Sequence, residues 1–186
     1  MPRLWNDTIE AHRQAVRDAT LDAAQQLVAK RGLASVTMSQ IAATTGIGRA
    51  TLYKYFTDVD AVLLAWHERQ IQRHLHQLAE ARDGGTDAAG RLHAVLQTYA
   101  LICRTHPVGD LAAGLHRGSH VAQAHQHLHD FVTELIDDAA RTADVRTDVP
   151  ATELAAYCLH ALGASTGMTE DAAQRLVTVT LAGLRP

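Results

Sequence analysis

The spacing of apolar residues along this 186-residue chain is helical almost throughout. Apolar positions recur every three to four residues, and no stretch alternates as a half-buried strand does. Gly32 ends the first periodic segment with an expected left-handed cap, a glycine-containing break follows at 83–87, and Pro107 ends a later segment. The pattern predicts an all-α fold of about nine helices, with a small N-terminal domain followed by a helical bundle.

A sharp turn between two short helices is indicated in the first third of the chain. Thr37 followed by Gln40 is a capping box, in which each side chain bonds to the other residue's backbone N–H. Gly46 suits a turn that only glycine adopts cheaply. Leu52 and Phe56 lie one helical turn apart and are expected to pin the second helix to the first. These features predict a helix-turn-helix, whose second helix can enter a DNA major groove.

The run at 36–56, with the preceding 27–32, resembles the TetR family of bacterial transcriptional regulators. The resemblance implies a three-helix DNA-binding domain at 1–57 and an effector-binding and dimerisation domain at 58–186. It also implies repression, with release from a pseudo-palindromic operator by a small molecule. Two residues depart from the family pattern, because Gly48 stands where a capping serine is common and Val59 where a lysine is common.

The DNA contacts follow from the same resemblance. Arg49 would donate two hydrogen bonds to guanine O6 and N7, and Ala50 and Thr51 would contact a thymine methyl. Thr37 and Ser39, at the start of the preceding helix, would bind a phosphate through a hydroxyl and the helix dipole. The remaining expected contacts, mainly to phosphate and sugar, are Tyr53, Lys54 and Tyr55.

Charge is distributed unevenly along the chain. Residues 1–82 hold ten Lys and Arg against eight Asp and Glu, a balance of +2, whereas the remainder holds seven against twelve, a balance of −5. The N-terminal stretch is no signal peptide, and no apolar run spans a bilayer, so we expect a cytoplasmic protein without a membrane partner. Cys103 and Cys158 form no CxxC pair and are expected to be buried, and no cofactor is predicted.

The C-terminal part predicts a second copy of the chain and a ligand. The segment 153–168 is apolar on nearly all sides, so one face needs a partner, and a homodimer joined by the last two helices is the simplest solution. Its aliphatic stripes favour a modest, apolar effector. The candidate ligand-binding residues on these stripes are Leu96, Tyr99, Cys103, His116, Phe131 and Tyr157.

Other function classes remain as alternatives. His125 and His129 are four residues apart and, with His116 or His160, could make a metal-responsive regulator. The simpler interpretation is that these histidines lie along the border of the apolar face of an amphipathic helix and that no metal binds. No enzyme motif is present, so no catalytic residue is assigned. An architectural DNA-binding protein would usually lack so large an acidic helical body.

Overall fold

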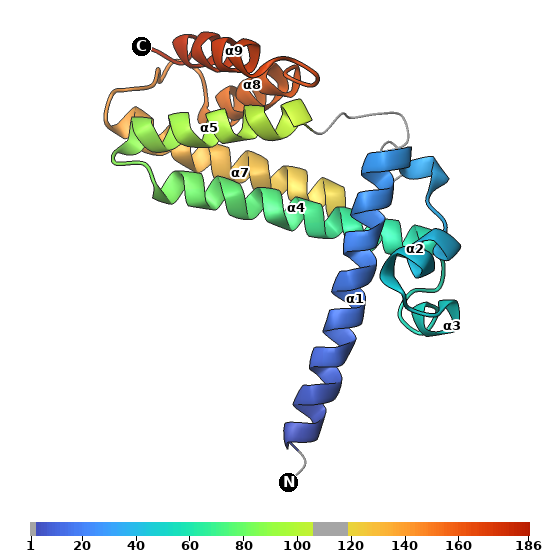
Figure 1. Cartoon of the computed structure of the whole chain (residues 1–186). Helices are drawn as coiled ribbons and strands as arrows, with labels where there is room; N and C mark the ends of the chain where they lie inside the picture. The colour runs from blue at the N-terminus through green and yellow to red at the C-terminus, as the bar shows by residue number, and fades with distance from the viewer. Residues whose placement is uncertain (1–2, 106–118) are drawn as a thin grey trace. The chain divides into compact units, whose positions relative to one another are not determined.

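The computed structural model describes residues 3–105 and 119–186, and it is built from helices (Figure 1). The described ranges contain eight α-helices, one short 3-10 helix and no strand. The all-α prediction is therefore confirmed; about nine helices are predicted and eight are described, and residues 110–117 lie outside the described ranges. The elements are α1 (Arg3–Arg31), η1 (Leu33–Ser35), α2 (Met38–Thr45), α3 (Arg49–Leu52), α4 (Val59–Asp83), α5 (Ala88–Thr105), α7 (Ser119–Arg141), α8 (Ala151–Gly163) and α9 (Glu170–Ala182).

The chain forms two compact units, Met1–Gln70 and Ile71–Pro186. Their boundary falls inside α4, so the first twelve residues of this helix belong to the first unit. The sequence-based boundary lies earlier, between 57 and 58, where the resemblance placed the end of the DNA-binding domain. Among the described helices, none combines the length and the apolar character that a bilayer crossing requires.

The first unit has its own small hydrophobic core. Buried side chains from α1, α2, α3 and the first part of α4 meet there, and Ile41, Leu52 and Val62 are completely shielded from solvent. Phe56 is only 4% exposed, which confirms that Leu52 and Phe56 pin the segment after the turn. Because α3 is a single turn long, these two contacts rather than helix propensity hold it in place.

The turns of the first unit follow local backbone chemistry. Thr37 accepts a hydrogen bond from the Gln40 amide, and the Thr37 amide donates to the Gln40 side chain across 2.9 Å, so the capping box is confirmed. Gly46 closes α2 at φ 70° and ψ 6°, in the left-handed region. Gly32 also has a positive φ of 76°, but its ψ of 159° differs from the expected left-handed cap. This extended glycine conformation leads the chain directly into η1.

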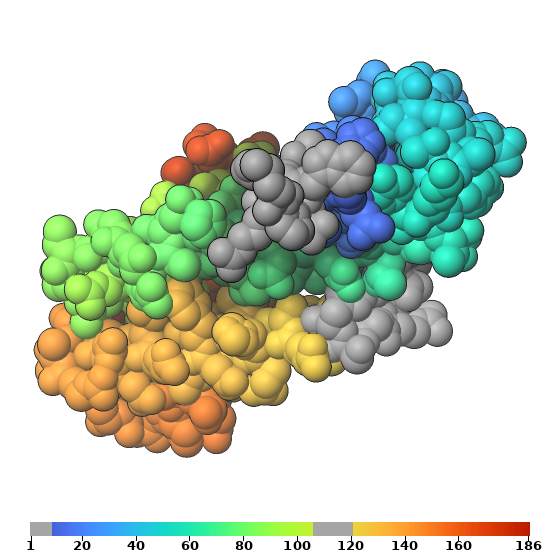
Figure 2. Space-filling view, turned by 90° about the horizontal axis from the view of Figure 1, so that it is seen from below, coloured from blue at the N-terminus to red at the C-terminus, as the bar shows by residue number. Residues whose placement is uncertain are grey.

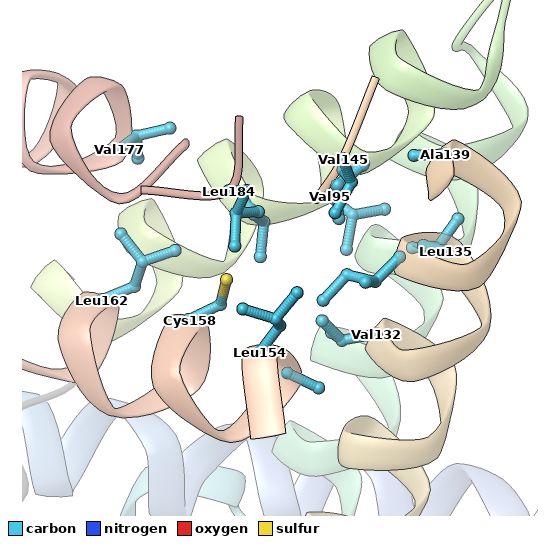
Figure 3. Packing of buried hydrophobic residues seen from close by; sticks show 14 of the residues in the cluster. Val95, Val132, Leu135, Ala139, Val145, Leu154, Cys158, Leu162, Val177 and Leu184 are labelled. Carbon is cyan, nitrogen blue, oxygen red and sulfur yellow. The ribbon is translucent and has the colours of Figure 1, made fainter. Parts of the chain in front are cut away.

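The second unit is organised around one larger core. Side chains from α5, α7, α8, α9 and the loop after α7 point toward a common interior (Figure 3), among them Val95, Val132, Cys158 and Val177. At one end of this unit, the turn after α8 caps α5. The Ser165 hydroxyl donates to the Ala100 carbonyl across 2.8 Å, and both groups are buried. The Thr166 hydroxyl donates to the Cys103 carbonyl and the Gly167 amide to the Arg104 carbonyl, each across 3.3 Å, and these two carbonyls are among the last four of α5, which have no partner within the helix.

The last turns of α4 contribute to the second unit through an aromatic contact. The Arg82 guanidinium lies 5.5 Å from the centroid of the Phe131 ring on α7, and Leu78 of α4 is 2% exposed in the core. The surfaces of these two helices adjoin in the space-filling view, where α4 is green and α7 yellow to orange (Figure 2). The apolar residues spaced at helical intervals between Val121 and Ile136 form the buried side of α7.

Candidate nucleic-acid interface

The segment that begins at Gly48 presents polar side chains outward, while its buried residues Leu52 and Phe56 face the core. Gly48 occupies the N-cap of α3 in an extended conformation, and no side chain caps this helix. The Phe56 amide donates to the Leu52 carbonyl across 3.0 Å, so helical hydrogen bonding continues beyond the single regular turn. The surface formed by α2 and α3, cyan in Figure 2, is open on its outer side.

The residues expected to contact DNA lie mainly on this outer surface. Arg49, Ala50 and Lys54 are exposed, and Tyr53 retains 45% of its accessible surface. Thr51 is half-buried, so its methyl and hydroxyl are partly available. Tyr55 is half-buried too, and its ring packs against the core of the first unit. An aromatic ring held in this way leaves only part of its edge for a phosphate or sugar.

Thr37 and Ser39 lie at the start of α2, as expected. Both residues are exposed. The Thr37 hydroxyl oxygen accepts from the Gln40 amide across 3.3 Å, which leaves its own proton available to donate to an anion. The two hydroxyls are thus compatible with a phosphate contact at this helix end.

The described residues leave three positive charges near α3 without a carboxylate partner. Among the described residues, no carboxylate pairs with Arg17, Arg49 or Lys54. Elsewhere in the first unit, by contrast, Arg69 pairs with Asp22, and Arg13 lies 4.0 Å from Glu10. Unpaired cations around an outward-facing helix attract a polyanion, and this attraction is sequence-independent.

Two cation–aromatic contacts at this surface were not anticipated from the sequence. The Arg17 guanidinium of α1 lies 5.2 Å from the centroid of the Phe56 ring, and that of Arg49 lies 5.9 Å from the centroid of Tyr53. The spacing of four residues between Arg49 and Tyr53 was a usable signal, because such residues share one face of a helix. Arg17 and Phe56 are distant in sequence, and only the fold brings them together.

A second missed feature lies behind the interface. Arg69 of α4 bonds to Asp22 across 2.7 Å and lies 3.8 Å from Asp18, and both carboxylates belong to α1. The four-residue spacing of the two aspartates marks one acidic face of a helix. Nothing local indicates that its partner lies 47 residues further on. The contact joins the first and last helices of this unit.

The second unit places the expected ligand-binding residues in different environments. Leu96 is completely buried in the core, and Tyr99 and Phe131 pack against the same core. Tyr99 and Cys103 form a side-chain hydrogen bond on α5. Burial, with the neighbouring thiol, raises the pKa of Tyr99, and burial raises the pKa of Cys103 despite the opposing effect of that bond. Both groups are therefore neutral at physiological pH.

Two of the expected ligand-binding residues are not part of this group. Tyr157 lies on the outward side of α8 and is 44% exposed, and His116 lies outside the described residues. A surface hollow of about 340 Å³ lies between the start of α5 and the end of α9. None of the expected ligand-binding residues lines it. Its lining includes Leu92 and Leu184, which are at most 2% exposed.

The histidines of α7 show no metal-binding arrangement in the described ranges. The Nε2 atom of His129 lies 3.0 Å from the Thr152 carbonyl oxygen, in a bond between α7 and the start of α8. His125 is exposed. No group of three His, Cys, Asp or Glu side chains within the described part could hold an ion. No observation therefore favours the metal-responsive alternative.

Two sequence profiles of known families match the chain. Residues 21–66 match the profile of bacterial regulatory proteins of the tetR family. Residues 96–186 match the C-terminal domain of SbtR-like transcriptional regulators. The chain is also similar to an uncharacterised HTH-type transcriptional regulator of Mycobacterium tuberculosis, with 32% identity over 102 residues, which are 54% of this chain and 50% of that protein. The chain spans about half the length of the curated relatives it matches.

Solved structures share the fold over most of the chain. A TetR/AcrR-family regulator from Thermobifida fusca superposes with a TM-score of 0.75 and 17% identity, covering 92% of this chain and 100% of that one. The regulator FadR from Bacillus subtilis, crystallised in complex with stearoyl-CoA, gives a TM-score of 0.70 and 12% identity, covering 90% of this chain and 98% of that one. At these identities, the likeness concerns the fold alone.

Proposed function

The chain belongs to the TetR family of DNA-binding transcriptional regulators, and we propose that it represses transcription from a pseudo-palindromic operator until a small-molecule effector releases it. The observation that carries the proposal is the outward surface of α3. There, Arg49 and Lys54 are exposed and unpaired with any described carboxylate, while Leu52 fixes the segment from behind. A guanidinium so presented can fork onto guanine in the major groove, and an ammonium can bind phosphate.

The proposed operator symmetry requires a homodimer. On α8, the side chains facing away from the core include Tyr157 and His160, and on α9 Val179 is 64% exposed. A Cβ atom added to Gly183 would lie 3.1 Å from the Tyr157 hydroxyl, so α8 and α9 form one continuous surface here. An exposed surface that spans two helices and carries the large apolar side chains of Tyr157 and Val179 suits a four-helix bundle with the same two helices of a second copy.

The dimer determines the form of the operator. A two-fold axis between the subunits would present two copies of α3 to successive major grooves, about 34 Å apart. Each copy would read one half-site, so the operator would be an inverted repeat. Thr37, Ser39, Tyr53 and Tyr55 would add phosphate or sugar contacts, and Ala50 and Thr51 would meet base edges.

The effector is proposed to be apolar and to bind in the second unit. Leu96, Tyr99 and Phe131 already share one hydrophobic core, and Cys103 adjoins Tyr99. The likeness to a regulator crystallised with stearoyl-CoA supports a ligand with an apolar part. The dimer is proposed to exist in two conformations that differ in the distance between its two α3 segments. An effector that binds better to the conformation unable to contact DNA would shift the population away from the DNA-binding state.

The proposal is tested by selecting DNA from a randomised duplex library with the purified full chain. We expect enrichment of an inverted repeat whose half-site centres are about 10 base pairs or slightly more apart. We also expect at least two chains per enriched duplex, and repression of a reporter that carries this duplex in its promoter. Recovery of sequences without any shared motif would contradict sequence-specific reading, and reporter activation would contradict repression.

A further inference from the structure

Tyr53 is an exposed aromatic residue whose ring lies beside Arg49, the proposed base-reading side chain. It follows Arg49 by four residues, and its amide donates to the Arg49 carbonyl across 3.0 Å, so the two residues share one face. The Arg49 guanidinium carbon is 5.9 Å from the ring centroid. This separation lies within the range over which a guanidinium is attracted to an aromatic face.

Few other groups restrain Arg49. Gly48 supplies no side chain, and no described carboxylate pairs with the guanidinium. The regular part of α3 is one turn long, and Arg49 itself is exposed. A long side chain under so little restraint samples many rotamers, and ordering it on DNA costs conformational entropy. The Tyr53 ring is the neighbour that can reduce this cost before DNA binds.

We propose that Tyr53 is a positioning residue for base reading, which holds the Arg49 guanidinium in the orientation that a guanine requires. This inference rests on the proposed operator recognition by α3. Stacking uses the flat face of the guanidinium, whereas its N–H donors point outward in the plane. A contact of the ring with the flat face of the guanidinium and a two-pronged bond to guanine O6 and N7 can therefore exist at the same time.

This role differs from that of an ordinary backbone contact. A Tyr53 hydroxyl bound to phosphate would strengthen binding to every sequence equally, because phosphates carry no sequence information. A ring that orients Arg49 strengthens binding mainly where a guanine lies under Arg49. The ring and the hydroxyl can be separated experimentally, because phenylalanine keeps the ring and removes the hydroxyl.

The test uses the full chain and the duplex enriched from the randomised library. Arg49→Ala first identifies the base pair at which discrimination disappears, and a second duplex is altered at that pair alone. For each variant, the discrimination ratio is the dissociation constant for the altered duplex divided by that for the enriched one. We expect Tyr53→Phe to weaken binding to both duplexes equally and to keep the ratio. We expect Tyr53→Leu to lower the ratio about two- to fivefold.

A double-mutant cycle isolates the coupling between the two side chains. In the Arg49→Ala background, Tyr53→Leu should leave the ratio unchanged, because no guanidinium remains to be oriented. Tyr53→Gln, which also removes the ring, repeats the test with a polar side chain suited to an exposed position. Thermal unfolding should be nearly the same for all Tyr53 variants, since this ring is 45% exposed.

Each remaining outcome contradicts a defined part of the account. Ratios that stay unchanged in Tyr53→Leu and Tyr53→Gln would overturn the positioning role and leave operator recognition intact. An unchanged ratio in Arg49→Ala would show that Arg49 reads no base, which also overturns the inference. Failure of the library to yield any enriched duplex would overturn the proposed function, and with it the inference.

Discussion

Nη2 of Arg69 lies 2.7 Å from Oδ1 of Asp22, in an ion pair that joins α4 to α1. The Arg69 side chain is 19% exposed, and its Nε atom is buried without a hydrogen-bond partner, so the guanidinium depends on its carboxylates. Because the first unit ends at Gln70, the pair lies at the last turn of α4 that belongs to this unit. It therefore fastens the end of the helix-turn-helix unit to its first helix.

Removing this pair should destabilise the first unit. Asp22→Asn removes the charge of the closer carboxylate, and we expect a loss of about 0.5–1 kcal/mol in the free energy of unfolding, because Asp22 itself is 58% exposed. Urea unfolding followed by circular dichroism measures it. The matched control is Glu10→Gln, since the Arg13–Glu10 pair is exposed and 4.0 Å long, and it should change stability by less. Equal losses of unfolding free energy in the two variants would show that the Arg69–Asp22 pair does not stabilise the contact between α4 and α1.

Gly46 should be the least replaceable glycine of the helix-turn-helix. Its φ of 70° lies in the left-handed region, although a Cβ there would meet no atom within 4 Å. Gly46→Ala should cost about 1–2 kcal/mol through backbone strain alone. Gly163→Ala, at an equally uncrowded position with an ordinary φ, should be neutral or slightly stabilising. Thermal unfolding compares the two, and a similar cost at both sites would argue against backbone strain.

The sequence predicts those parts of the fold that local interactions determine. The Thr37–Gln40 capping box, the turn at Gly46 and the one-turn spacing of Leu52 and Phe56 involve residues a few positions apart. Their geometry follows from capping, backbone freedom and helical periodicity. The overall class of fold follows for the same reason, because the apolar spacing is local information.

Features that depend on tertiary contacts were not predictable in this way. The partner of Asp22 lies 47 residues away, and the Phe56 ring beside Arg17 belongs to the segment between α3 and α4. The sequence places Tyr157 in an apolar stripe and so predicts a ligand contact, yet α8 directs its side chain outward. A helix that is apolar nearly all round does not reveal which side meets its own core. The ψ of Gly32 depends on the 3-10 turn that follows it, which the sequence did not indicate.

The proposed subunit interface should be sensitive to a charge on α9. Val179→Glu would place a carboxylate in the proposed contact between the subunits, and we expect a shift from dimer to monomer with weaker binding to the enriched duplex. Because Val179 is 64% exposed in the single chain, the fold of the subunit should survive. Analytical ultracentrifugation measures the shift. Ala122→Glu, on the exposed side of α7, is the control and should remain dimeric. A dimeric Val179→Glu protein would contradict this interface.

Stability should fall at alkaline pH through the buried thiol of Cys158. Burial raises the pKa of Cys158 to about 12, whereas the thiol of an unfolded chain has a pKa of about 8.5. Between these values the unfolded state loses a proton that the folded state keeps, so the free energy of unfolding decreases as pH rises. The contribution is complete below the unfolded pKa and is lost as pH approaches the folded one.

The corresponding measurement is urea unfolding at pH 7.5 and pH 10 for the wild type and for Cys158→Ala. The variant should be less stable at both pH values, because Cys158 is completely buried. Its decrease in unfolding free energy between the two pH values should nevertheless be smaller than that of the wild type by about 1–2 kcal/mol. Equal decreases would show that this thiol does not titrate differently in the two states.

The central claim is that the segment after Gly48 reads bases through Arg49 and binds the backbone through Lys54. The most direct measurement is a salt titration of binding to the enriched duplex and to a scrambled duplex, for the wild type, Arg49→Ala and Lys54→Ala. We predict that Arg49→Ala loses about 1–3 kcal/mol on the enriched duplex and much less on the scrambled one. Lys54→Ala should weaken both similarly and reduce the salt dependence by about one phosphate contact per chain. An Arg49→Ala protein that distinguishes the two duplexes as well as the wild type does would contradict the claim.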